Sequence, residues 1–438
     1  MRRSFPIPAL VFAAVLLLSI TSSASGEWRR AGLERLIINA VAVDPSNPSV
    51  LYAGAQIGGL WKSTNAGQSW SPINNGYTGD TASFLLVHPA APSILYVGSN
   101  AGVFQSVNGG ASWSPRNNGL PGGGIVAMAL DPANSSRLYV SVNAPGGGVF
   151  RSSDGGFNWT SRPLPVPSAT VATLSVFGSN VYAGWTNVVF RSSDDGVTWS
   201  IPYADILPSA VQTIAVRPGE TEAVVGLQQR GIWRSTHTPG PIWIDSSVGL
   251  TSFRISRIVV RPGDFDTLFA AGNGGGVFRS SDTGHTWSPL ADGLGNTDVA
   301  SLAFDASGRF LYAGTSDGVY ALDLETVGCG DTAALCLNHS RFRVRVEWRV
   351  ESQGTSGVGN PVQLAEDSGS FWFFSPNNLE LLVKVVDGRA FNGHYWVFYG
   401  ALSDVAYTIT VTDTTTGQIR TYVNAAGTVA SRADVAAF

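Results

Sequence analysis

Arg151-Ser-Ser-Asp-Gly-Gly-Phe-Asn-Trp159 is the stretch that decides the fold, because versions of it recur along most of the chain. Each well-preserved copy combines a serine, an Asp or Asn, a glycine and a closing tryptophan. Five copies end at Trp70, Trp113, Trp159, Trp199 and Trp287, and a divergent sixth ends at Trp243. Successive tryptophans are therefore 40 to 46 residues apart. A period of this length is typical of the four-stranded blade of a β-propeller.

The repeated phrase has the chemistry of a tight turn. An Asp or Asn side chain can accept hydrogen bonds from the following backbone, and glycine adopts the positive φ that the turn requires. The tryptophan can then pack beneath the hairpin. We expect a structural role for the side chains at this position, which are Asn65, Asn108, Asp154, Asp194 and Asp282.

Three further strands are predicted in each unit. An apolar run comes first, and a phrase such as Leu51-Tyr-Ala-Gly54 or Leu311-Tyr-Ala-Gly314 follows it. The third strand is of the Gly-Val-Phe-Arg-Ser type, and the fourth begins at the tryptophan. No segment has a sustained helical period, so the pattern indicates an all-β protein.

The two ends of the repeat complement each other. Residues 300–322 supply three strands without a following tryptophan, whereas Glu27-Trp28-Arg-Arg-Ala-Gly-Leu33 is similar to the phrase 286–294 after the last copy. We therefore predict that the Trp28 segment completes the last unit. The result is a closed seven-bladed β-propeller over residues 27–325, without open sheet edges.

The repeated phrase resembles the Asp-box, or BNR, repeat of sialidases, sortilin-type domains and related propellers, over six copies between residues 62 and 287. That resemblance implies that the boxes are scaffold. In addition, Tyr52-Ala-Gly-Ala-Gln-Ile-Gly-Gly59 is similar to Tyr-Ala-Arg-Thr-Asp-Ile-Gly-Gly of xyloglucan-cleaving glycosidases. The similarity places Gln56 where those enzymes carry a catalytic carboxylate. Because an amide cannot act as a general base, it implies that this chemistry is lost here.

Residues 1–26 have the pattern of a secretory signal peptide. Arg2 and Arg3 precede the apolar run Ala9–Ile20, and small residues follow it. The run is shorter than the about 20 apolar residues of a spanning helix. We expect cleavage after this segment and a secreted protein, extracellular or periplasmic, with no remaining membrane span.

Composition narrows the classes of partner. The net charge is −4 and charged residues make up 13% of the chain, so neither nucleic acid nor an anionic membrane is an expected partner. The two cysteines, Cys329 and Cys336, are expected to form a disulfide in an exported protein rather than a zinc site. No motif for a metal, a nucleotide or another cofactor is present.

The repeated phrase is absent from the last part of the sequence, and we assign residues 326–438 to a β-sandwich-like domain. Residues 342–350 alternate between apolar and charged side chains, which predicts a half-buried strand. More strands are expected at 371–374, 379–386, 394–399, 407–412 and 418–423. The region resembles an uncharacterised C-terminal module of exported bacterial proteins. The run Phe371-Trp-Phe-Phe374 is interpreted mainly as core, with a carbohydrate platform as the alternative.

A ligand is expected on one face of the propeller. The loops between second and third strands, together with the blade-to-blade loops, surround the mouth of the ring on the face opposite the repeated turns. This rim predicts binding of a glycan or a protein, through Gln56, Asn100, Asn143, Trp185, Arg230, Asn273 and Arg254.

The alternative function is a glycoside hydrolase on the same ring. Such an enzyme needs two carboxylates about 5 to 9.5 Å apart on either side of the scissile bond. The rim candidates are Asp80, Asp298 and Asp317. Two of them converging in a cleft would favour the enzyme, whereas a rim of amides and aromatics would favour binding, which is the reading that we prefer.

Overall fold

A computed structural model of the chain describes residues 28–438 except 167–168, 203–205, 217–222, 237–241, 291–292, 325–332, 339–340, 366 and 415. The predicted signal peptide and Cys329 lie outside the described residues. Strands dominate, and the described helical segments are the 3₁₀ turn Glu351–Gln353 and the short helix α1 (Arg389–Asn392). No described helix is both long and apolar enough to span a bilayer.

Seven small antiparallel sheets are formed by the described residues before position 325. The first three consist of β2 (Ile38–Asp44), β3 (Asn47–Ala55), β4 (Leu60–Ser63), β5 (Ser71–Pro72); β6 (Ala82–Val87), β7 (Leu95–Ser99), β8 (Gly102–Ser106), β9 (Ser114–Pro115); and β10 (Gly124–Leu130), β11 (Leu138–Asn143), β12 (Gly148–Ser152), β13 (Thr160–Ser161). The fourth has β14 (Thr173–Phe177), β15 (Asn180–Trp185) and β16 (Val188–Ser192), and a single bridge between Arg191 and Ser200 stands in place of a fourth strand.

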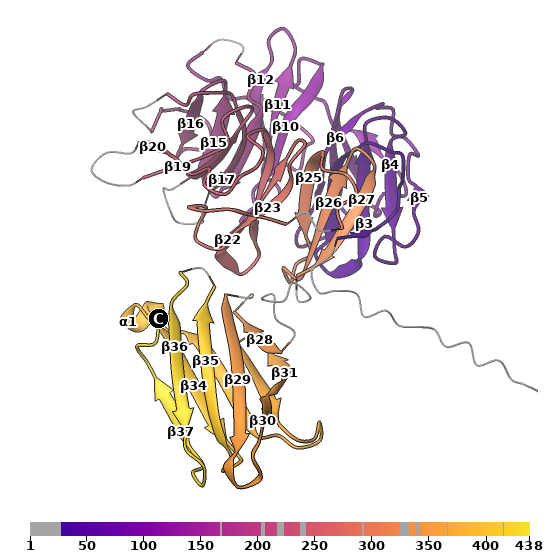
Figure 1. Ribbon diagram of the computed structural model, residues 1–438. Helices are drawn as coiled ribbons and strands as arrows, with labels where there is room; N and C mark the ends of the chain where they lie inside the picture. The colour runs from indigo at the N-terminus through magenta and orange to yellow at the C-terminus, as the bar shows by residue number, and fades with distance from the viewer. Residues whose placement is uncertain are drawn as a thin grey trace, which may run out of the picture.

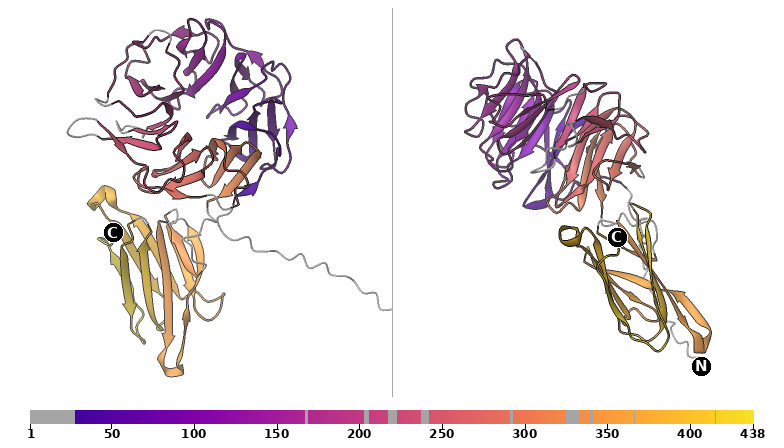
Figure 2. Two further views of the ribbon diagram at one scale, coloured as in Figure 1. Left: turned by 45° about the horizontal axis from the view of Figure 1, so that its top comes forward. Right: turned by 90° about the vertical axis from the view of Figure 1, so that its left-hand side faces the viewer.

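The remaining three sheets complete the repeat. They consist of β17 (Val211–Val216), β18 (Ala223–Leu227), β19 (Ile232–Ser235), β20 (Trp243–Asp245); β21 (Ile255–Arg261), β22 (Asp264–Gly272), β23 (Gly276–Ser280), β24 (Ser288–Pro289); and β25 (Val299–Phe304), β26 (Phe310–Thr315), β27 (Gly318–Asp323) with β1 (Arg29–Arg30). The first strand of each sheet contacts the first strands of both neighbouring sheets. The sheets are therefore arranged in a ring, with these seven strands around its axis (Figure 2).

The N-terminal segment closes the ring, as the sequence predicts. Arg29 and Arg30 of β1 pair with Ala321 and Tyr320 of β27. Trp28 is only 2% exposed and packs in the same apolar cluster as Tyr320. Its indole Nε1 donates a hydrogen bond to the carbonyl oxygen of Leu290 at 2.7 Å.

The repeated turn is held by a local hydrogen-bond network. The Ser152 hydroxyl donates to Asp154 Oδ1 at 2.8 Å and accepts from the amide of Gly156 at 2.8 Å. The same carboxylate oxygen accepts from the amide of Asn158 at 2.9 Å. The Trp159 indole then donates to the carbonyl of Arg116, across the boundary with the preceding sheet. The same pattern of bonds to the Asp or Asn side chain recurs at Asn65, Asn108, Asp194 and Asp282.

Residues 333–438 form two five-stranded sheets around one core (Figure 1). The first consists of β28 (Ala334–Leu337), β29 (Phe342–Val350), β30 (Thr355–Val358), β35 (Ala406–Asp413) and β36 (Ile419–Asn424). The second consists of β31 (Asn360–Ala365), β32 (Ser368–Trp372), β33 (Leu381–Asp387), β34 (Tyr395–Ala401) and β37 (Ser431–Asp434). We call residues 333–438 the C-terminal sheets.

The aromatic run of the C-terminal sheets belongs mainly to this core. Phe371 is fully buried and Phe373 is 4% exposed, whereas Phe374 is 52% exposed and packs edge-on against Trp348. Cys336 lies in β28. Its proposed partner is outside the described residues, so the disulfide stays a prediction, which mass measurement of the non-reduced protein would test.

Candidate functional site: the rim of the ring

The rim is built by hydrogen bonds between two kinds of loop. The loop between the second and third strands of a sheet bonds to the segment that enters the first strand. The Gln56 amide donates to the Ile37 carbonyl at 2.8 Å, and the Asn273 amide donates to the Arg254 carbonyl at 2.9 Å. Equivalent bonds run from the Gln228 amide to the Ala210 carbonyl and from the Ser316 amide to the Asp298 carbonyl. Predicted rim residues from different loops are thus brought onto one face.

Most predicted rim side chains reach solvent. The exposed side chains are those of Gln56, Asn100, Asn143, Arg230, Asn273 and Arg254. Trp185 differs, because its ring is half-buried and lies 6.3 Å from that of Phe190. Trp185 is therefore partly a packing residue, whereas the exposed rim side chains are chiefly amides.

A pocket of about 470 Å³ opens on the rim between the first and second sheets. Its lining comprises Ile57, Gly58, Gly59, Asn74, Tyr77, Gly79 and Asp80. Ile57 is 78% exposed, so an apolar side chain stands at the edge of this opening, and Asn74, Tyr77 and Asp80 contribute its polar groups. We call this cavity the rim pocket.

Three predicted site residues meet beside the rim pocket. The Asn100 side-chain oxygen accepts hydrogen bonds from the amides of Asp80 and Thr81, at 3.1 and 3.3 Å. The Thr81 hydroxyl donates to the Gln56 carbonyl at 3.0 Å. These bonds use the Gln56 carbonyl oxygen and the Asn100 side-chain oxygen as acceptors. They fix the positions of the two loops relative to the segment that enters β6.

Tyr77 and Asn74 line the pocket but were not among the predicted residues. Tyr77 is 8% exposed and packs edge-on against Phe104. Burial raises the pKa of its phenol to about 12, so it remains a neutral donor at physiological pH. Asn74 accepts a hydrogen bond from the Leu60 amide, and Asn117 does the same for Val103 in the next sheet. The repeated Asn-Asn-Gly phrase at 74–76 and 117–119 was the available sequence signal.

The three candidate carboxylates do not form a pair across the rim pocket. Asp80 is the one acid among its lining residues. Asp317 is bound elsewhere, by the Arg30 guanidinium and by the Arg35 amide. The hydrogen bond from Arg30 is the main cause of its lowered pKa, which disfavours a role as a general acid. Asp298 is exposed in the segment that enters β25. In the described part of the chain, no cluster of His, Cys, Asp or Glu is suited to holding a metal ion.

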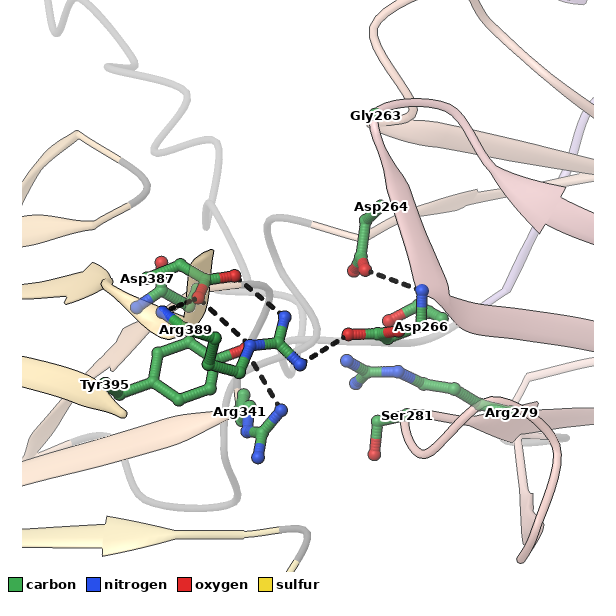
Figure 3. A pocket seen from close by; sticks show the side chains of 11 residues that line it. Gly263, Asp264, Asp266, Arg279, Ser281, Arg341, Asp387, Arg389 and Tyr395 are labelled. Carbon is green, nitrogen blue, oxygen red and sulfur yellow. Dashed lines mark hydrogen bonds and ion pairs between the residues drawn. The ribbon is translucent and has the colours of Figure 1, made fainter. Parts of the chain in front are cut away.

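A second cavity, of about 180 Å³, lies between the ring and the C-terminal sheets (Figure 3). Arg389 spans it and donates to Asp266 of β22 at 2.8 Å and to Asp387 at 2.7 Å. The Tyr395 ring lies 4.7 Å from this guanidinium. Because its cations and carboxylates are satisfied mainly by one another, we interpret this cavity as a joint rather than as a ligand site.

Comparisons with known proteins identify the fold. No family model and no curated protein matches the chain. Among solved structures, a GH74 xyloglucanase from Xanthomonas campestris is similar with a TM-score of 0.57 at 14% identity, over 92% of this chain and 81% of the enzyme. The RRP9 WD40 repeats give 0.55 at 15% identity, over 68% of this chain and 98% of theirs. A YCF48 structure bound to D1 peptide gives 0.53 at 15% identity, over 68% of this chain and 96% of its own. At these identities the similarity shows the fold alone, and this chain has a β-propeller fold.

Proposed function

We propose that this chain is an exported glycan-binding protein that does not hydrolyse its ligand. In this proposal residues 1–26 direct export, and residues 27–325 form a seven-bladed propeller of the Asp-box type. Residues 326–438 form a sandwich-like domain that positions the propeller. The rim pocket takes one part of the ligand, and the exposed amides of the rim bind the rest.

The single observation that carries the proposal is the lining of the rim pocket. Glycoside hydrolysis needs two carboxylates around the scissile bond, and the lining supplies Asp80 alone. Amide side chains such as Gln56 and Asn143 both donate and accept hydrogen bonds, which suits sugar hydroxyl groups. A pocket with one acid and an apolar edge, on a rim whose other exposed side chains are chiefly amides, favours binding over cleavage.

A glycan array with the purified chain from residue 27 tests this function. Ile57→Ser should weaken binding because it removes the apolar contact at the edge of the rim pocket. Val107→Ser is the matched control, since Val107 is 61% exposed in a repeated turn, outside the rim. Equal binding by both variants and the parent protein would move the site away from the rim pocket. Binding to peptides but to no glycan would reject the glycan proposal.

A hydrolysis screen on the same glycans tests the alternative. General acid–base groups each contribute roughly 10²–10⁴ in rate, so a glycosidase would turn over far above background. We expect no turnover. Hydrolysis that is abolished by Asp80→Asn, Asp298→Asn or Asp317→Asn would replace the binding proposal with the enzyme.

A further inference from the structure

At one position of the first strands, the sixth sheet carries a different type of residue from the other six sheets. This position is that of the first-strand residue that pairs with the fourth residue of the Leu-Tyr-Ala-Gly-type phrase, and in six of the seven sheets it directly follows a register shift. The equivalent pairs are Ala40–Gly54, Phe84–Gly98, Ala127–Ser141, Thr173–Gly184, Thr213–Gly226, Arg257–Ala271 and Ser301–Gly314. Six of these first-strand residues are uncharged. The sixth sheet alone carries a cation, Arg257.

Small hydroxyls at this position hold neighbouring sheets together. Thr213 accepts a hydrogen bond from the Ile258 amide at 3.1 Å, and Ser301 accepts one from the Val41 amide at 2.9 Å. In the sixth sheet the adjacent Ser256 makes the link instead, by donating to the Val299 carbonyl at 2.6 Å. The sixth and seventh sheets are therefore joined by a hydrogen bond that does not involve the Arg257 side chain.

The Arg257 guanidinium has no hydrogen bond or ion pair among the described residues. Its side chain is half-buried, and burial alone lowers its pKa. A guanidinium held in protein without a counterion is unfavourable, because it has lost part of its hydration and gained no partner. An anion at this place would remove that cost.

Among the described residues, no acid of the seven first strands lies close enough to the rim end to fill this role. The other charged residues of the seven first strands are Asp44 and Arg261, both at the strand ends that lie away from the rim. Arg257 is near the opposite end. It follows Ile255 by two residues, and Ile255 pairs with Gly272, which directly precedes the rim residue Asn273. Arg257 is therefore a cation carried by one of the innermost strands of the ring, at the end of that strand close to the rim.

We propose that Arg257 is an anion-binding residue and that it receives a carboxylate of an acidic oligosaccharide. This inference rests on the proposed glycan-binding function and adds the class of ligand. A guanidinium can donate two parallel hydrogen bonds to a carboxylate, and the rim amides can bind the neighbouring hydroxyls.

The test compares trigalacturonic acid with its trimethyl ester, because esterification removes the three negative charges and adds only three methyl groups. Calorimetric binding to the chain from residue 27 should show the acid bound about 10- to 100-fold more tightly than the ester, as expected for charge-assisted hydrogen bonds. Arg257→Gln should abolish this preference, and Arg257→Lys should keep part of it. Arg29→Gln, which changes an exposed arginine of β1, should leave it unchanged.

The melting temperature without ligand separates a binding role from a structural one. A guanidinium without partners contributes little to folding, so Arg257→Gln should melt no lower than the parent protein. A large loss of stability in that variant would overturn the proposal. Equal binding of acid and ester would also overturn it while leaving the glycan-binding function in place. Failure of every glycan to bind would reject both.

Discussion

The seam that closes the ring and the joint to the C-terminal sheets connect parts of the molecule in opposite ways. At the seam, Trp28 is buried and β1 adds backbone hydrogen bonds to β27. At the joint, Arg389 reaches Asp266 through an ion pair whose side chains are 41% and 24% exposed. Charge screening by salt does not weaken apolar burial or backbone pairing, whereas it does weaken the attraction between exposed charges. The ring is therefore expected to be the rigid unit and the joint the adjustable one.

The largest effect is expected at the seam. Trp28→Ala removes a fully packed indole and its hydrogen bond, and should lower the free energy of unfolding by about 3–5 kcal/mol. Calorimetry should show a lower melting temperature. Arg29→Ala, which changes an exposed neighbour, is the control. If Trp28→Ala left the melting temperature unchanged, the packing of the N-terminal segment against the last sheet would not stabilise the ring.

A smaller loss is expected in the repeated turn of the fourth sheet. Ser192 is 2% exposed and its hydroxyl accepts from the amides of Asp194 and Gly196. Ser192→Ala leaves these donors without a side-chain acceptor and should cost about 1–3 kcal/mol. Ser193→Ala, at the exposed neighbour, should change the unfolding free energy by less than about 0.5 kcal/mol. Equal effects of the two changes would contradict the role of the turn.

The same turn predicts an acid sensitivity within the ring. The Thr198 hydroxyl, with the Thr198 amide and Ser192, lowers the pKa of Asp194 to about 2. Because the folded-state pKa lies below the unfolded one, this contribution to stability is complete above about pH 4 and is lost as the pH falls towards 2. Asp194→Asn does not titrate, so its melting temperature should fall less than that of the parent protein between pH 4 and 2. Parallel curves would contradict this assignment.

The smallest change in stability is expected at the joint. Arg389→Ala should alter the free energy of unfolding by less than about 1 kcal/mol, because the pair with Asp266 is partly exposed. Its effect should appear in solution scattering, as a wider range of positions of the C-terminal sheets. High salt should reproduce this change in the parent protein. Arg349→Ala breaks a pair within the C-terminal sheets and is the control. A scattering profile unaffected by both Arg389→Ala and salt would show that other contacts hold the joint.

The sequence predicted those features that arise from local chemistry. A serine, a carboxylate and a glycine within five residues specify the turn, and Trp28 was found because its neighbours repeat those of Trp287. The pairing of Arg389 with Asp266 could not be found in this way. These residues are 123 positions apart, and each is an ordinary surface charge in its own segment.

The candidate site was predicted in part for the same reason. Gln56, Asp80 and Asn100 were selected from loop positions, and they do lie together. Tyr77 and Arg257 were missed because their importance depends on neighbours. Tyr77 looks like a loop aromatic until its ring is seen beside Phe104. Arg257 becomes unusual only when the register of all seven sheets is compared.

The pairing of β1 with β27 also sets the order in which the molecule can be completed. Arg29 is made near the beginning of the chain, but its partner Ala321 follows 292 residues later. At about 5–20 residues per second, synthesis of that interval takes ~15–60 s. Until then the last sheet lacks its outer strand and the Trp28 indole has no pocket. The Trp28 segment therefore stays unpaired for most of the time that synthesis takes, and the last sheet can be completed only when the whole ring has been made.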